Sequence, residues 1–492
     1  MWFKKIIAII FLIYGTIGLV LPSDPSIIIV GSGPAGIAAA TKLLKNNFTK
    51  IKILEAENRI GGRINSIKFG DAYVDLGAQF CHGQEGNIVY SMVKDFDILR
   101  PSTHKFQMIR SNGEKVDEET ANKIMNFAEL LLEASEEDPL PECENAKSVG
   151  ECLDIRSKVL EDSSKNDKQK EIFSEAHPWA KSYISALDGT LDLYDLDYNT
   201  TYKTCGGDLG MNWNGHGYKT ILEIMMQKYP NPDHQLPIDN KIFLEQTVAN
   251  ISNWQNDNRV TVTTTDGTKY EADHVIFTPS VGVLKANHEE LFTPALPADK
   301  ISAIKNTGFG AILKVIVHFN QRWYENNPTW AFFWTAKDVD ELEEKNLEWL
   351  LDMEGVVQAE NNPNVLVFWY SGSHVPLIET LSEATIKEAH EYLINKFLAP
   401  HYNVTMPDKY IRTTWFSNPN FRGTYSYESV KGHSGGQYNL QEKLGSPLMN
   451  EDGKLTLLFA GEATHPHYFS TVHGAIESGY READRLIEVY TK

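Results

Sequence analysis

The sequence predicts an α/β protein whose main sheet is assembled from separated segments and which carries a second, α+β domain. Three observations lead to this prediction. A strand, a glycine turn, a helix and a second strand follow one another at residues 27–55. Further apolar strands stand near residues 275–278 and 455–460. Two long inserts of different pattern lie between these pieces, and 492 residues suffice for two or three domains.

The N-terminal unit begins with the apolar run Ile27 to Val30, followed by the turn Gly31-Ser32-Gly33-Pro34-Ala35-Gly36 and an Ala-rich helix. A second strand at 51–54 ends at Glu55. A lone G-x-G-x-x-G is weak evidence. With a strand before it, a helix after it and an acid about 20 residues on, it predicts a Rossmann-like dinucleotide-binding domain. A glycine-rich turn without a ligand is the alternative, and it leaves the coincidence of all these parts unexplained.

Each residue of this unit has an expected role. Gly31 permits the tight turn, Gly33 lets the backbone approach a pyrophosphate, and Gly36 permits close packing of helix on strand. The helix N-terminus, where Ala35 stands, offers N–H groups and a positive dipole end to the phosphates. Glu55 would accept hydrogen bonds from a ribose.

The remaining elements divide between two domains. The nucleotide-binding domain is predicted from residues 26–103, 205–287 and 428–492, including a hairpin around Asp266-Gly267 and a C-terminal helix near 474–490. The substrate-binding domain is predicted from residues 104–204, which look mainly helical, and 288–427, which mix strands with helices.

Bulk composition excludes some functions and indicates an exported protein. A formal charge of −20 argues against nucleic acid or an anionic membrane as partner and favours a cationic ligand. Residues 1–22 read as a signal peptide with a basic start and an apolar core, or alternatively as an uncleaved anchor. Four Asn-x-Ser/Thr sequons agree with export, at Asn47, Asn199, Asn250 and Asn403. No stable membrane partner and no metal site are expected.

The four cysteines are Cys81, Cys143, Cys152 and Cys205, for which three complete pairings exist. A small loop joining Cys143 to Cys152 is favoured because both lie in one polar segment. Free thiols remain the alternative.

Two single residues are candidates for chemistry. Lys314 lies in the run Ala311 to Phe319, a strand with two largely apolar faces, where a lysine is unusual unless it is paired or functional. The alternative is a lysine that snorkels at a sheet edge. His82 stands in a loop before Gly83, where a structural role is the common one and a catalytic role the alternative.

Two further patterns suit a cationic amine. Asp188, Asp192 and Asp195 have helical spacing, which predicts either a solvated helix face or a set of carboxylates that holds distal ammonium groups. Aromatic residues are dense near 415–427 and at Tyr468-Phe469; they suit an amine or its cation, and are equally ordinary core residues.

The motif Arg59-Ile60-Gly61-Gly62-Arg63 directly after Glu55 resembles that of flavin amine oxidases and related flavoproteins. With the stretches 75–83, 275–285, 307–319, 415–427 and 459–483, the chain after residue 22 resembles the flavin-containing amine oxidases, and within them the animal polyamine oxidases. The resemblance implies noncovalent FAD, since no cysteine follows Cys205 to form a cysteinyl flavin. It implies Lys314 as the lysine that holds a water beside the flavin and His82 as the active-site histidine.

The FAD contacts that are predicted from the motifs and the resemblance are Gly31, Gly33, Ala35, Gly36, Glu55, Gly62, Arg63, Gly77, Ala78, Gln79, Val248, Gly461, Glu462, Thr471 and Val472.

The predicted substrate contacts are His82, Tyr425, Tyr468 and Thr471. Two departures from the family pattern matter. Phe80-Cys81 replaces bulky apolar residues before His82, which would reshape the site there. Thr471 stands where monoamine oxidases carry a cage tyrosine, which favours the polyamine oxidase pattern.

The expected function is that of a secreted FAD-dependent polyamine oxidase. It would oxidise spermine, spermidine or their N1-acetyl forms by hydride transfer to the flavin, with dioxygen as acceptor. The products would be an aldehyde, a shorter amine and hydrogen peroxide. The alternatives are a secreted L-amino-acid oxidase, for which Arg422 is the only arginine of the aromatic segment, and a catalytically silent FAD-binding glycoprotein.

Overall fold

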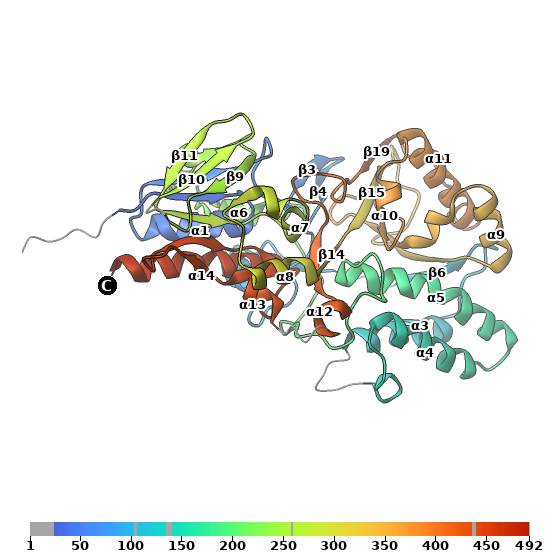
Figure 1. The fold of residues 1–492 in the computed structure, drawn as a ribbon. Coiled ribbons are helices and arrows are strands. Elements are labelled where there is room, and N and C mark those ends of the chain that lie inside the picture. Colours follow the sequence, from blue (N-terminus) through green and yellow to red (C-terminus); the bar gives the residue numbers. More distant parts are fainter. Residues whose placement is uncertain (1–23, 103–105, 134–139, 257–258, 435–438, 492) are drawn as a thin grey trace, which may run out of the picture.

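The computed structural model describes residues 24–102, 106–133, 140–256, 259–434 and 439–491. The predicted signal peptide lies outside these residues. The chain is of mixed α/β type, as predicted, and two six-stranded sheets dominate it. Figure 1 shows them in two halves, with α14 (Val472–Thr491) along one and β15 (Ile312–His318) in the other.

The first sheet is mainly parallel and has the order β21-β22-β12-β1-β2-β8. Strands from three distant stretches of sequence meet in it: β1 pairs in parallel with both β2 and β12, and β12 with β22. Its strands are Ile27–Val30 (β1), Ile51–Leu54 (β2), Ile242–Phe243 (β8), His274–Phe277 (β12), Leu448–Met449 (β21) and Leu455–Phe459 (β22).

Both faces of this parallel sheet are buried, which explains why its strands are apolar throughout. Helices α1 (Pro34–Lys45) and α14 cover one face together with α2 (Ile88–Val93) and α6 (Thr220–Met225). The close approach of α14 to α1 requires a glycine, because a Cβ on Gly479 would lie 2.2 Å from the carbonyl oxygen of Ala35.

The other face of the parallel sheet packs against a small sheet and two helices. The small sheet consists of β9 (Val248–Ser252), β10 (Val260–Thr264), β11 (Lys269–Ala272) and β13 (Phe292–Thr293). The helices are α7 (Val281–Leu291) and α8 (Ala298–Asn306). The Asp266-Gly267 turn joins β10 to β11 as predicted, with Gly267 at φ 84°.

The second six-stranded sheet has the order β19-β15-β18-β17-β16-β6 and draws on both predicted inserts. Its strands are Phe106–Arg110 (β6), Ile312–His318 (β15), Thr329–Phe333 (β16), Met353–Gln358 (β17), Val365–Ser371 (β18) and Lys409–Arg412 (β19). One face packs on α9 (Ala336–Glu344), α10 (Val375–Ile378) and α11 (Glu383–Leu393). The other packs on α3 (Glu118–Glu133), α4 (Val149–Asp162), α5 (Asp167–Asp188) and the hairpin of β3 (Ser66–Phe69) and β4 (Ala72–Asp75).

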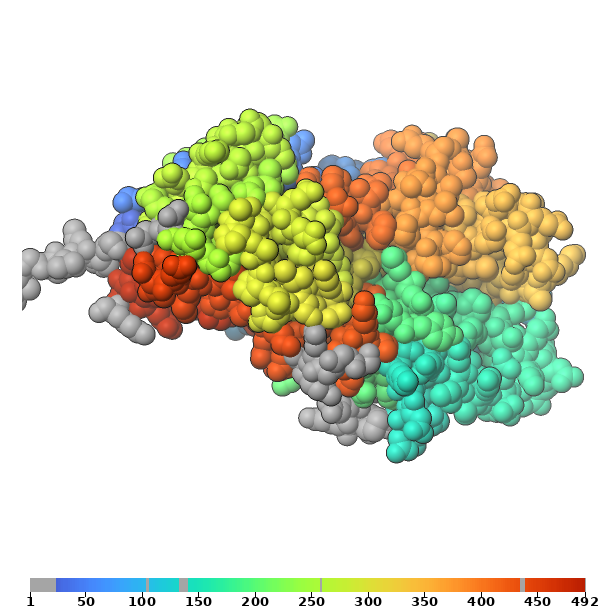
Figure 2. All heavy atoms as spheres, viewed as in Figure 1, coloured from blue at the N-terminus to red at the C-terminus, as the bar shows by residue number. Residues whose placement is uncertain are grey.

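Short elements complete the described chain. They are β5 (Arg100–Pro101), β7 (Met211–Asn212), β14 (Thr307–Gly310), β20 (Tyr425–Glu428), α12 (Val430–Ser434) and α13 (Leu440–Gly445). Figure 2 shows the same side with all atoms: segments of residues 240–300 and the C-terminal segment form the surface of one half, and segments near 150–200 and 330–400 that of the other.

The cysteines follow the favoured pairing. Cys143 and Cys152 form a disulfide, while Cys81 and Cys205 are free and buried. Of the two residues that depart from the family pattern, Cys81 belongs to the apolar core under the parallel sheet, whereas the Phe80 ring lies beside His82 with 6.5 Å between ring centroids. Among the described residues no helix is long and apolar enough to span a bilayer.

Candidate functional site

The glycine turn forms a cradle at the carboxyl end of β1. A Cβ on Gly36 would lie 2.1 Å from the carbonyl oxygen of Gly31, so only glycine fits there. Gly33 is the N-cap of α1 and gives it no side-chain cap, which leaves the helix N-terminus available to an anion. Gly62 approaches the turn from outside, since its Cβ would lie 3.1 Å from the Cα of Gly33.

Glu55 closes one side of this turn. Its carboxylate is buried and accepts hydrogen bonds from the Ser32 backbone N–H (2.7 Å) and hydroxyl (2.6 Å). Its carbonyl oxygen accepts from Gln246 N–H at 2.7 Å, two residues before Val248. The residues predicted to hold the nucleotide end of a cofactor therefore lie together around the ends of β1 and β2.

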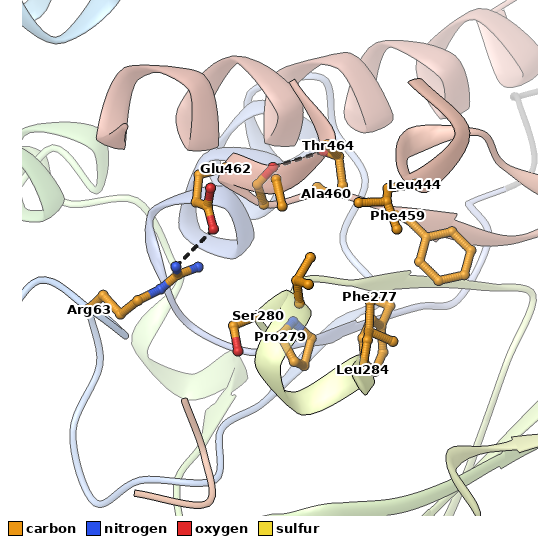
Figure 3. A pocket seen from close by; sticks show the side chains of 13 residues that line it. Arg63, Phe277, Pro279, Ser280, Leu284, Leu444, Phe459, Ala460, Glu462 and Thr464 are labelled. Atoms are coloured by element: carbon orange, nitrogen blue, oxygen red, sulfur yellow. Dashed lines mark hydrogen bonds and ion pairs between the residues drawn. The ribbon is translucent and has the colours of Figure 1, made fainter. Parts of the chain in front are cut away.

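A pocket lies at the carboxyl ends of β12 and β22, the edge at which open α/β sheets bind ligands. Arg63 donates a hydrogen bond from Nη1 to the Glu462 carboxylate at 2.9 Å and to the Thr424 carbonyl at 2.6 Å. Figure 3 shows the Arg63 guanidinium pointing to Glu462 across this pocket. The pocket is lined by Arg63, Phe277, Pro279, Ser280, Val281, Leu284, Leu444, Phe459, Ala460, Gly461, Glu462, Ala463 and Thr464.

Lys314 is buried inside β15, with 1% of its surface exposed, so the snorkelling alternative is wrong. Its Nζ donates to the carbonyl oxygens of Asp75 (2.8 Å) and Gly77 (2.9 Å) and to Oε1 of Gln79 (2.9 Å). It also lies 4.1 Å from the centroid of the Trp369 ring. Burial lowers the pKa of Lys314, and the charge of Asp75 opposes that shift.

The segment Gly77-Ala78-Gln79 connects Lys314 to Arg63. A Cβ on Gly77 would lie 1.8 Å from the Arg63 carbonyl oxygen, and Ala78 N–H donates to that oxygen at 3.2 Å. The structure thus brings the predicted lysine, the predicted arginine and this segment into one continuous contact.

His82 follows on the same loop. Its Nδ1 lies 2.7 Å from the carbonyl oxygen of Leu209, which can only accept, so Nδ1 carries the proton and Nε2 is left as an acceptor. Burial lowers the pKa of His82, and the ring is neutral near pH 7. The side chain is nevertheless solvent-accessible.

The C-terminal candidates lie at the start of α14. Thr471 caps this helix: its hydroxyl accepts from Gly474 N–H (3.0 Å) and donates to the Tyr468 carbonyl (2.7 Å), and Val472 is the first helical residue. Tyr468 stacks on His465 at 5.0 Å between ring centroids and contacts His473 edge-on at 4.9 Å. A Cβ on Gly86, four residues after His82, would lie 3.5 Å from the Tyr468 hydroxyl, which places this cluster near the His82 loop.

Tyr425 is fixed at the end of α5. Its hydroxyl donates to the Ala186 carbonyl, and its ring packs on Gly189, where a Cβ would lie 2.3 Å from a ring carbon. Gly189 ends α5 with φ 66°. The predicted helical face of three aspartates is therefore wrong: Asp188 ends the helix, and Asp192 and Asp195 follow in the turn beyond it. Asp195 accepts a hydrogen bond from the Tyr427 hydroxyl at 2.9 Å.

Asp188 differs from the other two aspartates. Burial raises its pKa to about 7, with no hydrogen bond or opposite charge among the described residues to offset that shift. It retains partial solvent exposure and acts electrostatically on Tyr425 and Tyr202. A desolvated carboxyl that water can still reach is suited to receive a cation.

Two residues of this region were not predicted, Trp369 and Glu354. Trp369 lies opposite Lys314 in the sheet. Gly355 on β17 lies opposite Trp369, and Glu354 directly precedes Gly355 at the point where the register of β17 shifts. An acid within the apolar run Met353 to Val357 was the signal that could have pointed to Glu354.

Comparisons with known proteins agree over nearly the whole chain. The family model for flavin containing amine oxidoreductase matches residues 34–487. A probable polyamine oxidase 5 of Arabidopsis thaliana is 27% identical and covers 94% of this chain and 98% of its own. The human peroxisomal N(1)-acetyl-spermine/spermidine oxidase is 28% identical, and the alignment covers 95% of this chain and 96% of that protein. The human lysine-specific histone demethylase 2 is 29% identical over 95% of this chain and 54% of its own.

Proposed function

The chain belongs to the flavin-containing amine oxidoreductases and uses FAD, and from this premise we propose that it is a secreted polyamine oxidase. The observation that carries the substrate class is the unpaired, desolvated carboxyl of Asp188 beside the Tyr425 ring. Burying an uncompensated carboxylate is unfavourable, so its presence near Tyr425, a predicted substrate contact, supports a cationic ligand. Relatives named for polyamine oxidation, at full length, support the same class.

The cofactor fits the residues present. The parallel sheet with its glycine cradle is the Rossmann-like half: Gly33 and the N-terminus of α1 would hold the pyrophosphate, and Glu55 the ribose. Arg63 and Glu462, paired across the pocket at the strand ends, would contact the cofactor beyond the phosphates. FAD supplies the acceptor for a hydride from the carbon next to the substrate nitrogen. We expect it to be bound noncovalently, because both free cysteines are buried.

The chain's own residues would orient the amine and keep it neutral at the reacting nitrogen. Burial disfavours an ammonium at the reacting nitrogen, and Nε2 of the uncharged His82 ring can accept a hydrogen bond from the neutral amine. Lys314 would hold a positive charge near the site of dioxygen reduction, and a water molecule bound there would take the place of one of its three present acceptors. Asp188 would bind a distal ammonium group.

The two rival functions have less support. An L-amino-acid oxidase needs an arginine for the substrate carboxylate, but Arg63 is engaged by Glu462 and Arg422 is exposed. The presence of Lys314, His82 and Glu462 at the positions that the family resemblance predicts argues against a catalytically silent flavoprotein.

The proposal is tested by peroxide release from purified protein with spermine, spermidine, N1-acetylspermine, a monoamine and an L-amino acid, with the visible spectrum recorded. Peroxide with a polyamine supports it. A yellow protein that is silent on every amine contradicts the polyamine oxidase activity. Secretion is tested separately, by the presence of the protein in culture medium with an N-terminus beyond residue 22; retention in membranes would favour the uncleaved anchor.

A pH experiment tests Asp188. Its pKa is higher in the folded protein than in the unfolded chain, so the folded state binds more protons between about pH 4 and pH 7 and loses stability as the pH rises through that window. Asp188→Asn removes this loss. We expect its melting temperature to exceed that of the wild type by roughly 2 °C or more at pH 8 and to approach it below about pH 4, the pKa of the unfolded chain.

The same variant should bind spermine more weakly at pH 8. Asp195→Asn, which changes an aspartate that already accepts a hydrogen bond from Tyr427, is the matched control and should not gain stability at pH 8. An Asp188→Asn protein whose stability tracks the wild type at both pH values would contradict the assignment.

A further inference from the structure

The structure assigns to Glu354 a second cation site, which binds a charged nitrogen of the substrate on the Lys314 side of Tyr425. The substrate would therefore be a polyamine with a positive charge on both sides of the reacting nitrogen, and free spermine would be preferred over its N1-acetyl form. This inference rests on the proposed polyamine oxidase activity and adds a residue that sets its specificity.

The position of Glu354 follows from the sheet register. Lys314 on β15 lies opposite Trp369 on β18, and Trp369 lies opposite Gly355 on β17. The register of β17 shifts between Met353 and Gly355, so Glu354 is an extra residue at a β-bulge. Bulges redirect side chains and are frequent beside active sites. The electrostatic interaction between Glu354 and Lys314 agrees with both side chains lying toward the same space.

The Glu354 carboxyl has an oxygen that lacks a hydrogen bond among the described residues, although the charge of Lys314 acts on the group. Its Oε2 is fully buried, and no described residue donates a hydrogen bond to it. The backbone around it is fixed, because the Trp179 indole N–H of α5 donates to the Glu354 carbonyl oxygen at 2.6 Å. A buried carboxyl oxygen without a donor, on a backbone that is held in place, is suited to receive a donor from a ligand.

Glu354 and Asp188 act on the same ring. Both influence Tyr425 electrostatically, and Glu354 also influences Tyr183, one helical turn along α5 from Trp179. Burial raises the pKa of Glu354 to about 8, although the charge of Lys314 acts in the opposite direction. Two such carboxyls beside one tyrosine match a molecule with at least two charged nitrogens. An acetylated nitrogen is neutral and gains nothing from the second carboxyl.

The decisive variant is Glu354→Gln, which keeps the size and removes the charge. Because hydrogen bonds to charged groups are among the stronger ones, we expect kcat/KM for spermine to fall about tenfold or more. For N1-acetylspermine we expect a change of at most about twofold. Removing an unpartnered carboxyl should leave the melting temperature unchanged or higher, so a folding defect is not expected.

Glu360→Gln is the matched control. Glu360 also acts electrostatically on Lys314 but lines a different pocket, with Tyr73, Asp75 and Gln79, and accepts a hydrogen bond from Ser102. It should leave the ratio of spermine to N1-acetylspermine activity at the wild-type value. An equal loss of that ratio in both variants would mean that Glu354 acts only through the charge of Lys314, and would overturn the site.

Equilibrium dialysis of spermine against the oxidised, FAD-loaded protein without dioxygen separates this inference from the proposed activity. Weaker spermine binding in Glu354→Gln than in wild type supports the site even if neither protein releases peroxide, in which case the proposed activity alone fails. Unchanged spermine binding together with an unchanged activity ratio would overturn the site while leaving the polyamine oxidase intact.

Discussion

Replacing Lys314 with methionine is expected to slow the consumption of dioxygen by the substrate-reduced protein about 100-fold. Lys314 is the only lysine of β15, and its charge is held at the site by Asp75, Gly77 and Gln79. Methionine matches its length but can neither carry a charge nor hold a water molecule as a donor. Reduction of the protein by substrate, measured without dioxygen in a stopped-flow instrument, should change much less.

Lys300 provides a control for the structural effect of this substitution. It is equally buried, donates to the carbonyl oxygens of Lys443, Leu444 and Ser446, and lies 4.0 Å from the centroid of the Phe459 ring. Lys300→Met should lower the melting temperature as Lys314→Met does, since both leave three acceptors without a donor. In FAD-loaded Lys300→Met the reaction with dioxygen should keep its normal rate. A normal rate in Lys314→Met as well would remove the role assigned to that lysine.

Gly33→Ala is expected to weaken FAD binding about tenfold or more without disturbing the fold. Gly33 has φ −67° and ψ 177°, which any residue can adopt, and its added Cβ would meet nothing closer than the Gly62 Cα at 3.9 Å. The methyl group would instead stand where the backbone must approach the pyrophosphate. Flavin absorbance per polypeptide after dialysis measures the effect.

Gly36→Ala separates a binding defect from a folding defect. Its Cβ would lie 2.1 Å from the Gly31 carbonyl oxygen, so the turn itself must shift. With saturating FAD the melting temperature of Gly33→Ala should return to the wild-type value, because ligand excess restores a protein that only binds weakly. That of Gly36→Ala should stay low. Full FAD retention by Gly33→Ala after dialysis would place the pyrophosphate elsewhere.

The elements that the sequence predicts correctly depend on contacts between neighbours in the chain. The first and second strands begin and end as predicted, with the predicted helix between them, because apolar runs, the glycine turn and the proline after Gly33 determine these elements locally. The alternation of residues around Lys314 predicts a strand buried on both faces, and the structure confirms it. The choice of Cys143 and Cys152 as the disulfide pair also needed only their proximity in one segment.

Other features of the site depend on contacts between distant segments. Asp188, Asp192 and Asp195 have helical spacing, but Gly189 ends the helix where Tyr425, more than two hundred residues away, packs on it. The bulge at Glu354 exists only in the pairing of β17 with β18, and the partners of Lys314 come from a loop near residue 77.

The sequence by itself therefore determined the nucleotide-binding unit, the family and the buried lysine. Each of these follows from the order and spacing of residues that are close together in the chain. Which carboxyls stand unpaired beside Tyr425 was decided only by the tertiary structure. A carboxyl is unpaired when no hydrogen-bond donor or cation lies next to it. Whether one does depends on how all the surrounding elements pack, and not on the residues next to the carboxyl in the chain.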